Sequence, residues 1–291
     1  MQSNRLGWLL LAPTLLILAM FGVFPFIYVL FVSFHQWNPF AVNPEMAFNW
    51  AANYRRVVFD AQFIASLGVT AAFVFFAVVS ELILGYALAQ AFMKDFPGKA
   101  FFRTIHTLPL IMAPIIVGSV WKLMTTPSIG IIPHLLDNWF GYDLNIGQSA
   151  GAAFVLTVIM DIWHWTPLVT LSLIAALVSL PPDPFEQAQI DGAGRWQIFW
   201  HITLPMIRPA ILATVFIRLM DALRTVDEVL MLTGGGPGSA TRYVGVHIFK
   251  EVFPRTNYGY GSAISVVVLY VTIVVCWLLY VGLIAPRNKK G

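Results

Sequence analysis

Six stretches of predominantly apolar residues run through this 291-residue chain. A membrane-spanning helix needs about 20 such residues, and each stretch reaches that length. Lipid offers the backbone no hydrogen-bond partner, so a segment inside the bilayer closes its own hydrogen bonds as a helix. The sequence therefore predicts an all-α, polytopic membrane protein with six transmembrane helices in one domain, residues 1–291. The predicted spans are residues 6–34, 64–93, 104–126, 149–180, 209–232 and 260–285.

The composition agrees with a membrane protein and excludes several other classes. Hydrophobic residues make up 58% of the chain and charged residues 11%, whereas soluble domains have about 25% charged residues. The basic residues flank apolar segments, which indicates a membrane lipid environment and not a nucleic-acid partner. The single cysteine, Cys276, and the scattered histidines show no metal-ligand spacing, so we expect no metal site.

The distribution of basic residues predicts the orientation of the chain. Cytoplasmic loops carry an excess of Lys and Arg. One set of connections holds nine basic residues and the opposite set holds five, which places both termini and the connection 181–208 in the cytoplasm. The nine are Arg5, Lys94, Lys99, Arg103, Arg195, Arg208, Arg287, Lys289 and Lys290; the five are Arg55, Arg56, Arg242, Lys250 and Arg255.

The connection 181–208 is too polar to cross a bilayer and contains strong helix signals. Asp183 is the expected N-cap, because Pro184 follows it and Glu186 lies three residues after it. A short helix is expected over 184–191, with Gly192 as its left-handed terminator.

A second short helix is expected from Arg195 to Leu204, closed by Pro205, with Pro209 beginning the next membrane helix. We name residues 181–208 the elbow. On these signals alone it could also be an ordinary interfacial hairpin.

The elbow resembles the cytoplasmic EAA loop of permease subunits from ATP-binding-cassette (ABC) importers. The residues that carry the resemblance are Glu186, Ala188, Asp191, Gly192 and Ala193, followed by Phe199, Ile202, Leu204 and Pro205. Gln187 departs from the pattern, which has Ala at this position. The six spans and the outward segments LTGGGPGSAT and YGYGSA resemble the sugar-transport branch, which includes the maltose and glycerol-3-phosphate systems.

This resemblance implies a fold, a set of partners and a function. The fold is that of a type I ABC importer permease in the bacterial plasma (inner) membrane. The implied partners are a second related permease, an ATP-binding cassette ATPase dimer and an extracytoplasmic solute-binding protein. The coupling contact to the ATPase falls on Glu186, Ala188, Asp191, Gly192 and Ala193.

The chain itself shows no catalytic site and no nucleotide site. Glycine-rich residues 234–238 lack the Lys that ends a phosphate-binding loop. ATP and Mg are therefore expected in the partner ATPase, and no cofactor is expected on this chain. The implied function is ATP-driven import of a sugar or sugar derivative, and the alternative is a secondary transporter driven by an ion gradient through Glu81, Asp161 and Asp221.

Polar residues at membrane depth are candidates for the solute path, because such residues are costly there unless they are paired or face water. Asp161, His164 and Trp165 are expected on one side of the fourth span, next to Trp163. On the fifth span, Arg218, Asp221, Thr225 and Glu228 are expected on one face, with Arg224 pairing to Asp221 or Glu228. The other interpretations are ion pairs that only lock helices together and an interfacial tryptophan pair. The candidate path residues are Asp161, Trp163, His164, Trp165, Arg218, Asp221 and Arg224.

Overall fold

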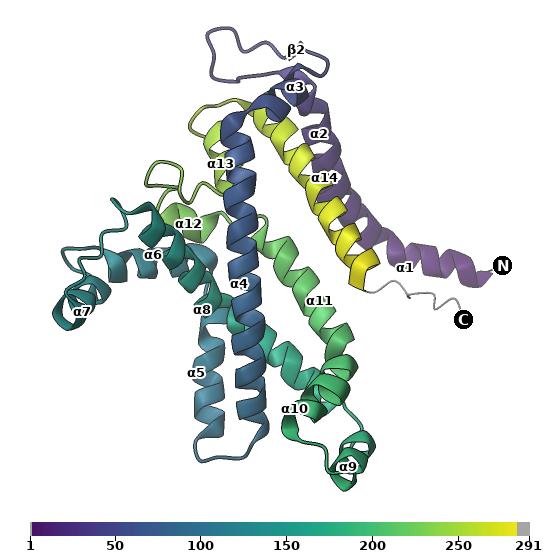
Figure 1. The fold of residues 1–291 in the computed structure, drawn as a ribbon. Coiled ribbons are helices and arrows are strands. Elements are labelled where there is room, and N and C mark those ends of the chain that lie inside the picture. The colour runs from purple at the N-terminus through teal and green to yellow at the C-terminus, as the bar shows by residue number, and fades with distance from the viewer. Residues whose placement is uncertain (1, 284–291) are drawn as a thin grey trace. The chain divides into compact units, whose positions relative to one another are not determined.

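The structure, a computed structural model, describes residues 2–283 as two compact units (Figure 1). Residues 2–65 and 247–278 form unit 1, and residues 66–246 with 279–283 form unit 2. The predicted tail cations Arg287, Lys289 and Lys290 lie outside the described residues, as do the last two residues of the sixth predicted span. The single domain remains a prediction.

Unit 1 holds the first and last membrane helices and a short hairpin. Strand β1 pairs antiparallel with β2, with His35 opposite Phe48. The elements are α1 (Gln2–Leu18), a π-helical turn η1 (Ala19–Val23), α2 (Phe24–Ser33), β1 (His35–Gln36), β2 (Ala47–Phe48), α3 (Ala52–Phe59) and α14 (Tyr258–Leu283). Helix α14 continues to the last described residue, 283.

Asp60 directly precedes α4 (Ala61–Met93) and hydrogen-bonds to the start of this helix and to α14 within unit 1. Its Oδ1 accepts hydrogen bonds from the backbone N–H groups of Gln62 (2.8 Å) and Phe63 (3.2 Å), as an N-cap does. Its Oδ2 accepts a hydrogen bond from the Tyr260 hydroxyl on α14. Partial burial disfavours the charged carboxylate, but the hydrogen bonds outweigh that effect and hold the pKa of Asp60 below its usual value.

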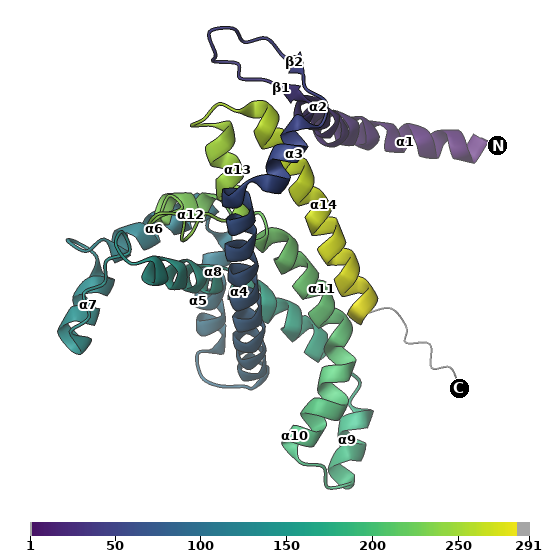
Figure 2. The ribbon, with the colours of Figure 1, turned by 45° about the horizontal axis from the view of Figure 1, so that its top comes forward.

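Unit 2 contains most of α4 and the remaining helices. In order these are α5 (Lys99–Ile111), α6 (Pro114–Thr125), α7 (Ile131–Phe140), α8 (Ala150–Val178), α9 (Asp183–Ile190), α10 (Arg195–Ile198), η2 (Phe199–Thr203), α11 (Leu204–Ala222), α12 (Asp227–Leu232) and α13 (Val244–Val252), whose last residues belong to unit 1. The elbow lies at the same end of unit 2 as the α4–α5 loop, and α12 lies toward the other end (Figures 1 and 2).

The third predicted span is broken into α5 and α6, which meet at 104°. Met112 and Ala113 are extended, with ψ of 139° at both. Ala113 precedes Pro114, whose ring disfavours helical geometry at the residue before it, while Pro114 itself is well suited to begin α6. Within residues 2–283, five helices are long and apolar enough to cross a membrane, or six if this bent pair is one span.

Two π-helical turns explain why prolines that follow them do not end their helices. The N–H of Phe24 bonds to the carbonyl of Ala19, and the N–H of Leu204 bonds to the carbonyl of Phe199. Each donor directly precedes a proline, Pro25 or Pro205. The wider turn accommodates a residue that lacks an N–H and would clash in a regular helix.

The prediction that Pro205 closes the second elbow helix was therefore wrong. The helix runs from Arg195 to Ala222 and contains both Pro205 and Pro209.

The fifth predicted span ends at Ala222 instead of residue 232. Residues 223–226 leave the helix, and α12 packs against α6. Gly118 permits this approach, because a Cβ there would lie 2.4 Å from the Glu228 carbonyl oxygen. The prediction that Thr225 and Glu228 continue the helical face of Arg218 and Asp221 was wrong, because the helix stops between the two pairs.

The core of unit 2 lies between α4, α8, α11 and α12. Buried Phe73 and Ala77 of α4 pack with Val158 of α8, Ala222 of α11 and Val229 of α12. This core positions the charged side chains described below.

Candidate functional site

The elbow begins with α9, which ends in the predicted left-handed turn. Gly192 has φ of 75°, and the N–H of Ala193 bonds back to the carbonyl of Ala188 at 2.9 Å. This is a Schellman-type helix end. The predicted N-cap was one residue off: Asp183 lies inside α9, Pro182 occupies the cap position, and no side chain caps it.

The side chains of α9 divide into an inner and an outer face. Ala188 is buried within the chain, so its small size serves packing inside the elbow. Glu186, Gln187 and Ile190 of α9 are exposed, as is Asp191 directly after it, and we name these four residues the outer face. Glu186 also borders the pocket described next. The side chain of Ile190 is 86% exposed, although it is apolar. The sequence interpretation missed Ile190; the available signal was its spacing of four residues from Glu186, which places the two on one side of the helix.

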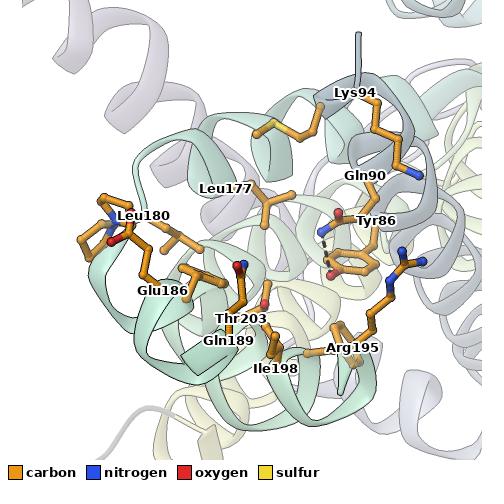
Figure 3. Close-up of a pocket in the computed structure, with 15 residues that line it drawn as sticks. Tyr86, Gln90, Lys94, Leu177, Leu180, Glu186, Gln189, Arg195, Ile198 and Thr203 are labelled. Carbon is orange, nitrogen blue, oxygen red and sulfur yellow. Dashed lines mark hydrogen bonds between the residues drawn. The ribbon is translucent and has the colours of Figure 1, made fainter. Parts of the chain in front are cut away.

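A pocket of about 760 Å³ separates the elbow from the ends of α4 and α8 (Figure 3). Lys94 and Arg195 lie on one side of it, beside Tyr86, whose hydroxyl accepts a hydrogen bond from Gln90 at 2.9 Å. Glu186 lies on the other side. The elbow thus stands away from the helix ends over part of its length.

The second half of the elbow is continuous with α11 and contains no flexible joint. The carbonyl of Gly194 accepts a hydrogen bond from Ile198, while Gln197 Oε1 accepts one from the Gly194 N–H at 2.7 Å. Helix α10 then passes through η2 into α11. Trp196 and Trp200 on this segment are 73% and 57% exposed, and exposed Trp is enriched at membrane surfaces.

A buried cluster of charges joins three helices at the centre of unit 2. Arg218 on α11 donates two hydrogen bonds to Glu81 on α4, from Nε to Oε2 (2.6 Å) and from Nη2 to Oε1 (2.8 Å). Nη2 also donates to Asp161 Oδ2 on α8 (2.7 Å), and Nη1 donates to Asp221 Oδ2 (2.8 Å). Glu81, Asp161 and Arg218 are each at most 1% exposed. We name these four residues the Arg218 cluster.

The predicted solute-path residues on α8 fall on two different sides. Asp161 and His164 are buried, and the ring of Trp165 lies beside the His164 ring (4.9 Å) and against the Arg218 guanidinium (4.7 Å). The three therefore share a side, as predicted. Trp163 is 40% exposed and contacts Trp121 of α6 instead (6.0 Å).

Three buried polar atoms beside the Arg218 cluster lack partners among the described residues: Asp161 Oδ1, His164 Nδ1 and Trp165 Nε1. His164 Nε2 lies 3.3 Å from the carbonyl oxygen of Met112, at the break between α5 and α6. Buried polar atoms are nearly always paired in proteins. This side of α8 therefore holds an unusual group of buried polar atoms without partners among the described residues.

Arg224 does not form the predicted pairs. Within the described part of the chain, it makes no ion pair with Asp221 or Glu228. Asp221 pairs with Arg218 instead, because both lie on the last turns of α11, whereas Arg224 follows the end of that helix.

Comparison with known proteins agrees with this architecture. Residues 81–290 match the family of binding-protein-dependent transport system inner membrane components. The chain is 36% identical over 272 residues to the trehalose/maltose transport system permease protein MalF of Thermococcus litoralis, covering 91% of this chain and 89% of that protein. It is 31% identical over 293 residues to the trehalose transport system permease protein SugA of Mycobacterium tuberculosis, covering 100% and 93%.

A solved structure shows the same fold. A chain of a bacterial ABC transporter involved in the import of the acidic polysaccharide alginate superposes with a TM-score of 0.80 at 21% identity, over 96% of this chain and 94% of that one. The matched residues, 81–290, include the elbow and all of α8 and α11. The chain therefore belongs to the binding-protein-dependent transport system inner membrane components, and it is a permease subunit of an ABC importer.

Proposed function

We propose that this permease carries a sugar or sugar derivative inward and that an ATPase dimer drives this transport by binding the elbow. The solute would arrive from an extracytoplasmic binding protein, and a second related permease would complete the channel. The observation that carries the coupling role is the outer face of α9, where Ile190 stands 86% exposed beside Glu186. An exposed apolar side chain next to a charge, on a helix fixed by a rigid turn, is suited to a protein partner.

The continuous helix from Arg195 to Ala222 gives the elbow a way to act on the membrane region. A displacement of α9 by the ATPase would move α11 directly, because η2 keeps the helix unbroken through Pro205. The same displacement would act on α8, which ends at Val178, shortly before α9 begins. Conversely, tilting of these helices would signal solute arrival to the ATPase.

The proposed orientation places the elbow and both termini in the cytoplasm. The α4–α5 loop lies at the same end of unit 2 as the elbow (Figure 1). Lys94 is in this loop, and Lys99 and Arg103 lie in the first turns of α5. Positive charge at one end of the spans supports a cytoplasmic location for that end. The relatives whose names contain trehalose and maltose support a sugar as solute.

The solute path is proposed along the side of α8 that carries Asp161, His164 and Trp165. Its support is the set of three buried, unpartnered atoms, which can hydrogen-bond to hydroxyl groups, next to an aromatic face against which a sugar ring can stack. Trp165→Phe removes one N–H and keeps most of the ring. We expect weaker solute uptake, seen as a raised KM, while Trp163→Phe on the other side of the helix leaves KM unchanged. Equal effects of the two variants would contradict this path.

The elbow contact is tested by Ile190→Ser. Burying an isoleucine is worth about 1.5–3 kcal/mol, so we expect the affinity for the ATPase to fall about 10- to 150-fold. Co-purification from membranes and ATP-driven uptake measure this loss. Val42→Ser is the matched control, since Val42 is 99% exposed in the loop between β1 and β2. Retention of the ATPase by the Ile190 variant at the wild-type level would contradict the proposal.

A further inference from the structure

The Arg218 cluster contains more acids than one arginine can balance. Three carboxyl groups surround one guanidinium, and Glu81 and Asp161 have no exposed side-chain surface. If all three acids were ionised, the cluster would carry two uncompensated negative charges at membrane depth. Uncompensated buried charges are strongly unfavourable, and a buried acid normally becomes neutral instead.

Arg218 has almost no hydrogen-bonding capacity left with which to stabilise the excess negative charge. Of its five N–H groups, four already donate within the cluster. Arg218 forms an ion pair with each of the three acids. Other titratable side chains close enough to interact electrostatically with Asp161 or Asp221 include His164 on α8, Glu228 on α12 and Tyr243 after α12, and none of them supplies a fixed positive charge.

The hydrogen bonds of Arg218 identify Glu81 and Asp161 as the two acids between which a proton would reduce the excess negative charge. One nitrogen, Arg218 Nη2, donates to both Glu81 Oε1 and Asp161 Oδ2, which brings these carboxyl groups together. Each group therefore has an oxygen within 2.8 Å of the same nitrogen, and both side chains are fully buried. Two ionised carboxylates held this close repel each other, because neither has a proton to donate. One proton held between them removes that repulsion, as in other paired carboxyl groups.

We propose that Glu81 and Asp161 share one resident proton, so that α4, α8 and α11 are joined by a four-residue ion cluster with a proton as its fifth member. The proton belongs to the folded subunit and is not exchanged for solute. With it bound, the cluster carries one net negative charge instead of two.

Infrared spectroscopy of the assembled transporter in lipid nanodiscs tests the proton directly. The wild type should show the C=O stretch of a protonated, buried carboxyl group. Glu81→Gln should abolish it, because the glutamine N–H replaces the shared proton and leaves Asp161 ionised. Asp161→Asn should abolish it in the same way, which keeps the test available if one variant folds poorly. Asp221→Asn should retain the band.

Thermal unfolding against pH gives a second readout. The folded state holds a proton that the unfolded chain releases at neutral pH, so stability should fall as pH rises. Glu81→Gln should remove that fall, while Asp221→Asn keeps it. Absence of the carboxyl band in the wild type, or its loss only in Glu228→Gln, would overturn the proposal, as would an unchanged pH dependence in Glu81→Gln.

Discussion

Replacement of Gly192 by Asp tests whether the elbow acts as a coupling lever. Gly192 has φ of 75°, and a Cβ built there meets no atom within 4 Å. The only local penalty is the left-handed backbone, about 1–2 kcal/mol for an ordinary residue and less for Asn or Asp, which adopt this region more readily. Native stability is commonly 5–15 kcal/mol, so we expect Gly192→Asp to fold and insert.

Coupling should nevertheless fail in this variant. The new carboxylate would stand beside exposed Asp191, at the surface we assign to the ATPase. Coupling free energies are about 1–3 kcal/mol, so their loss corresponds to about a 5- to 150-fold fall in ATP-driven uptake. Uptake and solute-stimulated ATP hydrolysis by the complete transporter in proteoliposomes measure the effect.

Gly192→Asn is the matched control, because it has the same shape without the charge. If Asn preserves uptake and Asp abolishes it, the charge at the contact is responsible. If both variants lose coupling with normal melting temperatures, close approach at the turn is responsible. Wild-type uptake by Gly192→Asp would refute the proposal that the elbow couples the ATPase to the membrane helices.

Three further predictions concern stability, each measured by thermal unfolding of the detergent-solubilised protein. Arg218→Met leaves three acids without a cation and should destabilise unit 2 by about 3–5 kcal/mol; a change within error would show that the acids are not held by Arg218. Gly118→Ala should destabilise by about 1–3 kcal/mol, because its Cβ would lie 2.4 Å from the Glu228 carbonyl oxygen. Gly151→Ala, with no atom within 4 Å of its Cβ, should change little, and equal effects would contradict the α6–α12 packing. Tyr260→Phe removes a hydrogen bond that lowers the pKa of Asp60; the lost stabilisation should be evident at neutral pH and vanish as pH falls below 3.8, whereas a difference independent of pH would contradict this role.

The sequence predicted the features that depend on local chemistry. Apolar length located the membrane helices, and the left-handed turn at Gly192 followed from glycine's lack of a Cβ. The common side of Asp161, His164 and Trp165 followed from helical spacing. The partners and the direction of insertion stay predictions.

The features that the sequence did not predict depend on contacts between distant residues. Pro205 and Pro209 indicated helix ends, but the wider turn at 199–203 accommodates Pro205 and the helix continues. The end of α11 at Ala222 depends on the packing of α12 against Gly118, which no local pattern reveals. The union of Glu81, Asp161 and Arg218 joins residues up to 137 positions apart, so their pairing appears only in the folded chain.

The most direct measurement of the coupling claim is photo-crosslinking from position 190 in the assembled transporter. A photoreactive amino acid in place of exposed Ile190 would react with whatever covers the outer face of α9. We expect a crosslink to the nucleotide-hydrolysing subunit, with a yield that changes when ATP is bound. A crosslink to the extracytoplasmic binding protein, or none to the ATPase in a transporter that still imports solute, would contradict it.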